Sequence, residues 1–215
     1  MAPLRYSPMH DMIKAFGLFT LLIFISCQKS NLVVKKDDQG RISEEYNIDA
    51  DSLKHGEFTS YINGVLVEKS NYEKGVLQGL RRLYHTNGQV EIEEIYDKGQ
   101  IVDVYKVYFH DGTLAQEAQY ENGMMQGMIR SYHKDGSIKE EVTMVANEEN
   151  GPFKEYHPNG NLEWEGTYLD GDNEYGLLLN YNEQGELIKK MMCDSMARCT
   201  TIWTVDKGDL PLQKN

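Results

Sequence analysis

The sequence predicts an all-β fold, an elongated single-layer antiparallel meander of consecutive hairpins. The main observation is a 24-residue period, because marker glycines fall at positions 40, 64, 88, 112, 136, 160 and 185, with one slip of a single residue. In one unit, Asn87-Gly88 separates two runs of alternating side chains. Asn-Gly and Asp-Gly pairs favour tight type I′ hairpin turns, since both central residues need a positive φ. No stretch of the array has the apolar spacing of a helix.

A second set of turns lies between the marker glycines, each with the pattern Tyr-x-x-Gly, at Gly75, Gly99, Gly123 and Gly171. The two sets of turns divide the chain into short strands. Residues two and eight positions after each marker glycine are mostly apolar, as at Leu114 and Tyr120. Because side chains of a strand alternate between its faces, this spacing predicts that both positions belong to one apolar face.

Charged residues predict the register of the hairpins. Glutamates lie five residues after most marker glycines, and arginines or lysines lie six residues before them. Two-residue turns would place these positions opposite each other, as Arg82–Glu93, Lys106–Glu117, Arg130–Glu141 and Lys154–Glu165. Opposite charges across two strands stabilise one register by about a few tenths of a kcal/mol per pair. We interpret this ladder as structural.

The N-terminal residues predict a bacterial lipoprotein signal peptide over 1–26, with Met12 as an alternative start. Its apolar core, 15–25, has the length of a signal-peptide core and is too short to span a bilayer. Ser26 then precedes Cys27, the expected lipidation site, whose acyl chains would attach the protein to a membrane. Phe24 departs from the leucine that is usual there. The alternative is an ordinary signal peptide or a short anchor.

Residues 27–37 are predicted to be the acylated cysteine and a solvated polar tether. The alternative for Lys35-Lys36-Asp37-Asp38 is a signal for export to the cell surface. Together these observations predict a lipid-anchored protein of the bacterial cell envelope, with the outer membrane favoured and the periplasmic or surface face left open.

The repeat resembles the MORN-repeat variant family, including YwqK-type proteins that are commonly labelled antitoxin components. The resemblance rests on the recurring Tyr-x-x-Asn/Asp-Gly turn with a glutamate after it, as at Tyr132, Gly136 and Glu141, and on the Tyr-x-x-Gly turns. It covers about residues 38–192. It implies a long twisted sheet of hairpins, and it brings no catalytic residues.

Two places depart from this pattern. Met144 and Asn147 replace a tyrosine and a glycine of the second turns. Val102-Asp103 stands where the other units have Gly79, Gly127, Gly151 and Gly176. Bulged or longer turns are expected at both places.

Residues 194–215 break the period and are predicted to form a cap or tail after the array of 38–193. Cys193 and Cys199 are close in sequence and would form a disulfide in an oxidising envelope compartment, with two free thiols as the alternative. Such a bridge would hold the last strand and protect an open sheet edge.

Five tyrosines recur four residues before the marker glycines: Tyr84, Tyr108, Tyr132, Tyr156 and Tyr181. Packing between hairpins is the favoured interpretation, because a single-layer sheet has no second layer to bury them. The alternative is a platform for sugars or an extended peptide. Trp164 breaks the pattern on the apolar face and is the best single candidate for an exposed contact, so these six aromatic residues form the candidate binding surface.

His85, His133 and His157 occupy the same place in three units. Neighbouring units lie about 10 Å apart, at two inter-strand spacings, whereas zinc ligands lie about 2 Å from the ion. We therefore expect solvated histidines beside turns, and neither a metal site nor a cofactor. The sequence has no nucleophile elbow, phosphate loop or metal-spaced Cys/His cluster, so we expect no enzymatic activity.

The chain carries a formal net charge of −12, which disfavours nucleic acid and anionic headgroups as partners. The leading hypothesis is a non-enzymatic interaction lipoprotein whose repeat array binds a protein partner or acts as a scaffold. A narrower version makes it an immunity-like antitoxin whose partner is a toxin, which rests on the resemblance alone. The alternative function is binding of glycan or cell wall through the tyrosines.

Overall fold

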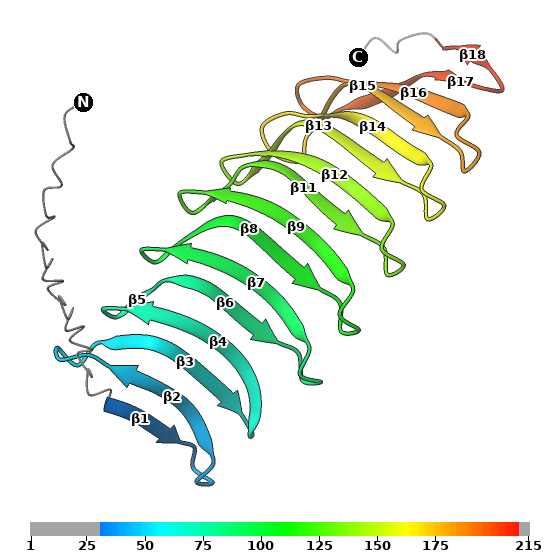
Figure 1. Cartoon of the computed structure of the whole chain (residues 1–215). Coiled ribbons are helices and arrows are strands. Elements are labelled where there is room, and N and C mark those ends of the chain that lie inside the picture. The colour runs from blue at the N-terminus through cyan, green and yellow to red at the C-terminus, as the bar shows by residue number, and fades with distance from the viewer. Residues whose placement is uncertain (1–30, 211–215) are drawn as a thin grey trace, which may run out of the picture.

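The computed structural model describes residues 31–210 and confirms the all-β prediction (Figure 1). Its strands form one open antiparallel sheet of 18 strands, without a helix in the part of the chain described. In that part there is also no helix that could cross a membrane. The predicted signal peptide over 1–26 and the lipidation site Cys27 lie outside the described residues.

In chain order the strands are β1 (Asn31–Lys36), β2 (Ile42–Ile48), β3 (Lys54–Ile62), β4 (Val65–Glu73), β5 (Val76–Leu77), β6 (Gly79–Tyr84), β7 (Val90–Asp97), β8 (Gln100–Tyr108), β9 (Leu114–Glu121), β10 (Met124–Met125), β11 (Gly127–Tyr132), β12 (Ile138–Val145), β13 (Glu148–Tyr156), β14 (Leu162–Tyr168), β15 (Glu174–Tyr181), β16 (Leu187–Cys193), β17 (Cys199–Thr204) and β18 (Gly208–Asp209).

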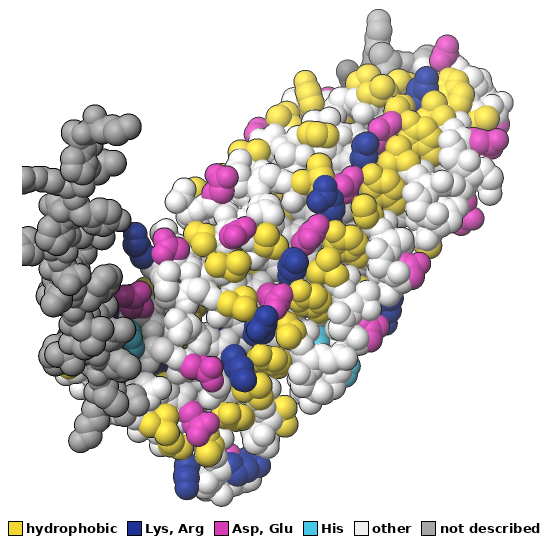
Figure 2. All heavy atoms as spheres, in the orientation of Figure 1, with side chains coloured by type: hydrophobic (Ala, Val, Ile, Leu, Met, Phe, Trp, Pro, Cys, Tyr) yellow, Lys and Arg dark blue, Asp and Glu magenta, His cyan; other side chains and the backbone are white. Residues whose placement is uncertain are grey.

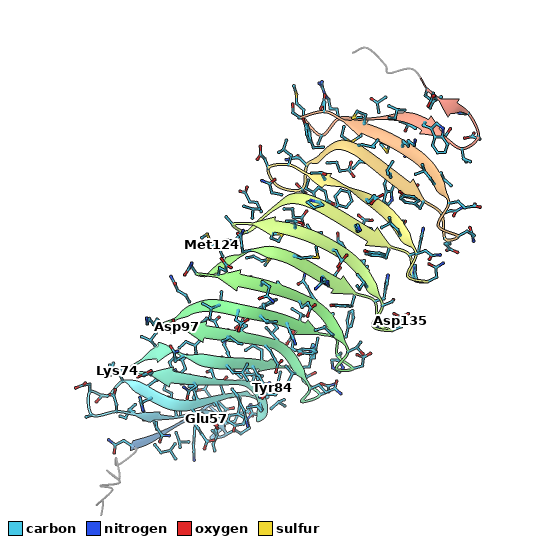
Figure 3. The ribbon with its side chains drawn as sticks, turned by 45° about the horizontal axis from the view of Figure 1, so that its top comes forward. Glu57, Lys74, Tyr84, Asp97, Met124 and Asp135 are labelled. Atoms are coloured by element: carbon cyan, nitrogen blue, oxygen red, sulfur yellow. A yellow bond between two sulfur atoms is a disulfide. The ribbon has the colours of Figure 1, made fainter. Side chains whose placement is uncertain are left out.

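Each strand pairs with the next one in the chain, as a meander requires. The short strands β5 and β10 are the exceptions, because β4 pairs with both β5 and β6, and β9 with both β10 and β11. Figure 3 shows the two edges of the sheet, with Lys74, Asp97 and Met124 at the edge of the second turns and Asp135 at the edge of the marker turns.

Asn63-Gly64 forms the predicted two-residue turn, with φ of 54° and 82°, but the later marker turns are not the type I′ turns that the Asn-Gly pairs predict. In the turn at 85–89, the amide of His85 donates to the carbonyl of Gln89, and the amide of Gly88 donates to the carbonyl of His85. Only the glycine has a positive φ, of 85°. The side chain of Asn87 explains the difference, because its oxygen accepts a hydrogen bond from the amide of Gln89 and holds Asn87 in a negative-φ turn conformation. The result is a three-residue turn followed by a bulge.

The bulge restores the register that two-residue turns would give. The three-residue turn adds one residue to the hairpin, and the pairing of β6 with β7 shifts by one between Leu83 and Tyr84. Beyond the shift, Arg82 lies opposite Glu93, as predicted. The other three predicted pairs are also confirmed: Lys106–Glu117, Arg130–Glu141 and Lys154–Glu165.

The second turns at Lys74-Gly75, Lys98-Gly99 and Asn122-Gly123 do have the type I′ signature, with positive φ at both central residues, whereas Asp170-Gly171 has positive φ values within a longer loop between Tyr168 and Glu174. Neither departure lengthens a turn, but a bulge lies beside each, because the pairing shifts between Glu93 and Ile95 and between Val142 and Met144. Ala146 and Asn147 adopt φ of 53° and 72° in the same two-residue turn, and Asp103 adopts 62°, close to the 75° of Gly79 at the equivalent position. Asparagine and aspartate tolerate this conformation better than most residues.

The bulges also overturn the prediction of one apolar face. Leu114 lies opposite Tyr108 on the face that holds Lys106, whereas Tyr120 lies opposite Asp103 on the other face. The extra residue of the bulge shifts the alternation between these two positions. We call the face with the charged pairs the ladder face. The opposite face is the core face, and it holds most of the buried side chains: Phe58, Ser70, Ala118, Val142, Met144, Phe153, Leu178 and Cys193.

The array is longer at both ends than predicted. Residues 31–36 of the predicted tether form β1, which pairs with β2 and places Val33 opposite Tyr46. At the other end, β17 and β18 continue the sheet into the segment predicted as a cap or tail. Cys193 and Cys199 lie opposite each other in β16 and β17, and a disulfide joins them.

Candidate interaction surface

A row of charged side chains crosses the ladder face strand by strand. Following the pairing from β4 to β16, the row consists of Lys69, Arg82, Glu93, Lys106, Glu117, Arg130, Glu141, Lys154, Glu165, Leu179 and Lys190. The sign alternates without a break from Arg82 to Glu165. Figure 2 shows this row as alternating dark blue and magenta side chains that run along the molecule.

Short ion pairs hold the charges of this row in place. The Nε atom of Arg82 lies 2.7 Å from Glu93, and that of Arg130 lies 2.8 Å from Glu141. The hydrogen bond from Arg130 lowers the pKa of Glu141 below its usual value, against the opposing effect of burial. Both arginine side chains are about 40% exposed (42% and 40%), so each pair contributes little to stability. The row is ordered and accessible to a partner.

The five predicted tyrosines do form one row, beside the charges and nearer the marker turns. Four of them donate a hydroxyl hydrogen bond to a glutamate of the preceding unit: Tyr108 to Glu93 (2.8 Å), Tyr132 to Glu117 (2.8 Å), Tyr156 to Glu141 (2.9 Å) and Tyr181 to Glu165 (2.7 Å). Burial and this hydrogen bond raise the pKa of Tyr108 to about 12. The glutamates therefore link the tyrosine row to the charged row.

Aliphatic side chains alternate with the tyrosines in this row. Opposite each tyrosine, the next strand places an aliphatic residue: Val90 for Tyr84, Leu114 for Tyr108, Ile138 for Tyr132, Leu162 for Tyr156 and Leu187 for Tyr181. All ten side chains are half-buried. This packing between hairpins is the interpretation that the sequence favoured.

A third row, without charges, lies on the other side of the charged row from β6 to β16. It consists of Leu80, Ile95, Val104, Gln119, Met128, Thr143, Pro152, Thr167, Leu177 and Met192. Four of its side chains are well exposed for apolar residues: Leu80 (41%), Met128 (41%), Leu177 (46%) and Met192 (41%). These residues were not predicted from the sequence, although their spacing of two from the ladder residues indicates their face.

Trp164 does not belong to the same surface as the tyrosines, so the predicted six-residue surface is wrong in this part. Trp164 precedes the ladder residue Glu165 and therefore points to the core face, where it packs against the cluster around Phe153 and Leu178. The ammonium of Lys189 lies 5.5 Å from the centre of its ring. Its half-buried position makes Trp164 a packing residue rather than an exposed contact.

The three equivalent histidines are not merely solvated, as the sequence suggested. The Nε2 atom of each lies near the carbonyl oxygen of a tyrosine in the next unit: His85 to Tyr108 (3.0 Å), His133 to Tyr156 (3.5 Å) and His157 to Tyr181 (2.9 Å). A carbonyl only accepts, so Nε2 carries the proton. The histidines thus connect neighbouring marker turns.

Glu174, Cys193 and Cys199 form a group of potential metal ligands within the described residues. The two sulfurs are joined to each other and are not available as thiolates. The depressions of the ladder face are shallow and open. One of about 440 Å³ lies between neighbouring units and is lined by Val90, Glu93 and Tyr108, among others.

An open single-layer sheet of stacked, equivalent hairpins defines a repeat array whose long faces are its main surfaces. Three segments match the model of the MORN repeat variant: residues 77–98, 104–122 and 149–170. These three segments are similar to MORN-variant repeats, and repeats of this kind suggest a binding or scaffold role. A search of curated proteins finds no match to the chain.

Proposed function

We propose that this protein is a non-enzymatic lipoprotein of the bacterial cell envelope, attached by acyl chains on Cys27, whose repeat array binds a protein partner or acts as a scaffold. Cys27 directly follows an apolar run of signal-peptide length, which supports the anchor. The MORN-variant matches support the role of the array. The outer membrane is the favoured location.

The observation that carries the proposal is the ladder face. Three parallel rows of partly exposed side chains cross β6 to β16, with apolar residues on both sides of an ordered row of charges. Rows of this length suit recognition of an extended surface, because each unit repeats the same set of contacts. A surface of exposed apolar side chains beside fixed charges is typical of protein interfaces.

The arrangement of the polar groups supports a role without catalysis or cofactors. The glutamates of the ladder face accept hydrogen bonds from tyrosines and arginines, unit after unit. A general acid–base pair needs a unique environment, whereas these carboxylates share one repeated environment.

Two narrower functions remain proposals of lesser support. An immunity-like antitoxin, with a toxin as partner, rests on the resemblance to YwqK-type proteins. Glycan or cell-wall binding would use the tyrosine row. The hydroxyls of Tyr108, Tyr132, Tyr156 and Tyr181 already donate to glutamates, which leaves them less available to sugars.

The test is a pull-down from detergent-solubilised envelopes of cells that also carry the untagged protein, with a C-terminally tagged full chain as bait. We expect one protein in stoichiometric amount. A Lys106→Glu/Lys154→Glu bait should lose it if the ladder face is the site. Lys98→Glu/Lys134→Glu is the matched control, since it makes the same charge change at exposed turn residues. Recovery of wall fragments alone, or of nothing, would contradict the proposal.

The anchor is tested separately by Cys27→Ser. The variant should leave the membrane fraction and lose acyl labelling with a fatty-acid probe. Retention of the label would show that another residue is modified.

A further inference from the structure

We propose that two copies of this chain pair face to face through their ladder faces, in one antiparallel register. The inference rests on the proposed interaction role of the array and names the partner of this face as a second copy. The two-fold axis runs parallel to the strands, between β9 and β11. It places β6 over β14, β7 over β13, β8 over β12 and β9 over β11.

The charged rows are self-complementary in this arrangement. A two-fold axis parallel to the strands reverses the order of the strands and keeps each row over itself. The alternating signs then meet as Arg82–Glu165, Glu93–Lys154, Lys106–Glu141 and Glu117–Arg130, each occurring twice. Opposite charges meet over eight strands because the two copies have the same repeat length. An unrelated partner would not share this repeat length.

The ends of the charged row select this register over its neighbours. A shift by one strand brings like charges together along the middle of the row. A shift by two strands places Lys69 over Lys154 in one direction and Arg82 over Lys190 in the other. In the proposed register, Lys69 instead faces the neutral Leu179. The alternation of charge breaks at two places, between Lys69 and Arg82 and at the neutral Leu179. Together these breaks disfavour the shifted registers, because like charges would meet in them.

The flanking rows match in the same register. The tyrosine row places an aromatic residue of one copy over an aliphatic residue of the other, as Tyr84–Leu162, Val90–Tyr156, Tyr108–Ile138 and Leu114–Tyr132. Large side chains thereby meet smaller ones along the whole row. The uncharged row places Leu80 over Thr167 and Ile95 over Pro152, so no charge is buried without a partner there.

The charge distribution favours this face over the rest of the surface. The row from Lys69 to Lys190 holds six basic and four acidic residues, a net of +2, in a chain of −12. The acidic excess therefore lies outside this row, so the net charge of the chain does not oppose the pairing of two copies through it. Eight strands about 4.8 Å apart and three side-chain rows cover roughly 700 Å² per copy, close to a standard protein interface.

The first experiment is sedimentation equilibrium of the full chain with Cys27→Ser, in a mild detergent that covers the apolar run at 12–26. We expect a monomer–dimer equilibrium that salt weakens, because the ion pairs across the interface are part-exposed. Lys154→Glu, which would face Glu93 twice, should raise the dissociation constant at least about tenfold. The exposed turn variant Lys134→Glu should leave it unchanged. A monomer at all concentrations up to about 100 µM would overturn the proposal.

The second experiment tests the register with variants that each carry one added cysteine in the same background, in which Cys193 and Cys199 remain joined. Leu80→Cys and Thr167→Cys face each other across the proposed interface, whereas in one chain they lie seven strands, about 34 Å, apart. Mixing and oxidising the two should give crosslinked dimers. Leu80→Cys mixed with Thr143→Cys, two strands out of register, is the control and should crosslink far less. Equal or reversed yields would overturn the register even if a dimer forms.

The envelope pull-down separates this inference from the proposed function. Recovery of the untagged chain itself would support self-pairing. Recovery of a different protein, with a monomeric purified chain, would support the interaction role and overturn self-pairing.

Discussion

Two regions of the core face, the hairpin around Gly88 and the C-terminal half, solve the same packing problem with opposite chemistry. Seven residues before and six after Gly88 lies the ion pair Arg81–Glu94, whereas the units on either side have Phe58–Ser70 and Tyr105–Ala118 in this row. The equivalent positions of the C-terminal half hold Phe153–Gly166 and Leu178–Met191. The hairpins around these pairs have the same turns, bulges and register.

The next row on the core face consists of the residues five before and four after each marker glycine, and here the apolar pair lies in the N-terminal half. That pair is Leu83–Ile92, whereas the C-terminal half has Glu155–Trp164 at the equivalent positions. This second row thus changes from apolar to polar toward the C-terminus, whereas the first row is charged only in the hairpin around Gly88. The backbone hydrogen bonds and the bulges define the repeat. Either of these two rows of the core face can be the buried one, provided that each hairpin buries one of the two.

The charged interior of the hairpin around Gly88 depends on complete pairing. Arg81 lies 2.9 Å from Glu68 and 3.0 Å from Glu94, and these carboxylates are only 17% and 12% exposed. Tyr96 donates a further hydrogen bond to Glu94. Buried charges are tolerated when each has its partner and become costly when one is removed. The apolar half has no such dependence and relies on close contact instead.

The largest expected effect is the loss of close contact in the apolar half. Leu178 is 1% exposed and belongs to the cluster of Val142, Met144 and Phe153. Leu178→Ala should destabilise the protein by about 4 kcal/mol, since it leaves a cavity. Urea unfolding measures the loss, and hydrogen exchange should place it in β13–β16. Leu83→Ala, at a half-buried site of the other half, should cost less than half as much, and equal losses would contradict the comparison.

Gly166 is the second test of the same half. A Cβ at this position would lie 2.2 Å from a methyl group of Leu178 and 2.7 Å from the ring of Phe153. Gly166→Ala should therefore cost about 2–3 kcal/mol, because the core must shift to admit a methyl group. The double variant Gly166→Ala/Leu178→Ala should lose less than the sum of the singles, since the smaller residue makes room. Strict additivity in urea unfolding would show that the two side chains do not compete.

Arg81→Leu tests the charged hairpin around Gly88. The substitution leaves Glu68 and Glu94 buried without their cation and should cost about 2 kcal/mol. Adding Glu94→Val recreates an apolar pair like those of the C-terminal half and should recover at least half of that loss. A double variant that is no more stable than Arg81→Leu would show that the two regions are not interchangeable.

The smallest effect concerns a carboxylate in the apolar half. Burial, followed by repulsion from Glu140, Glu163 and Glu174, raises the pKa of Glu155 above its usual value. The folded state therefore binds more protons than the unfolded state between the two pKa values, so stability falls as the pH rises through this window. Glu155→Gln should raise Tm by about 1 °C at pH 7 and by less at pH 4. A larger gain at pH 4 would contradict this sign.

Local patterns in the sequence were sufficient where neighbouring residues decide the outcome. The all-β class and the pairs such as Arg82–Glu93 follow from a fixed spacing of turns. The assignment of Leu114 and Tyr120 to one face failed, because a one-residue bulge changes the alternation without changing the spacing of the turns. Trp164 does lie on the apolar face where the sequence placed it, but the cluster around Phe153 and Leu178 covers it, so it is not the expected exposed contact.

The sequence by itself determined the repeat length, the all-β class and the register of the charged pairs, since these depend on turn positions and strand alternation. Only the tertiary structure decided which residues of different units meet. The hydrogen bond from His85 to Tyr108 joins residues 23 positions apart, and Arg81 binds Glu68 and Glu94 on two neighbouring strands. Such contacts depend on how far bulges rotate each strand and how closely hairpins stack. Neither quantity is encoded in any single stretch of the chain.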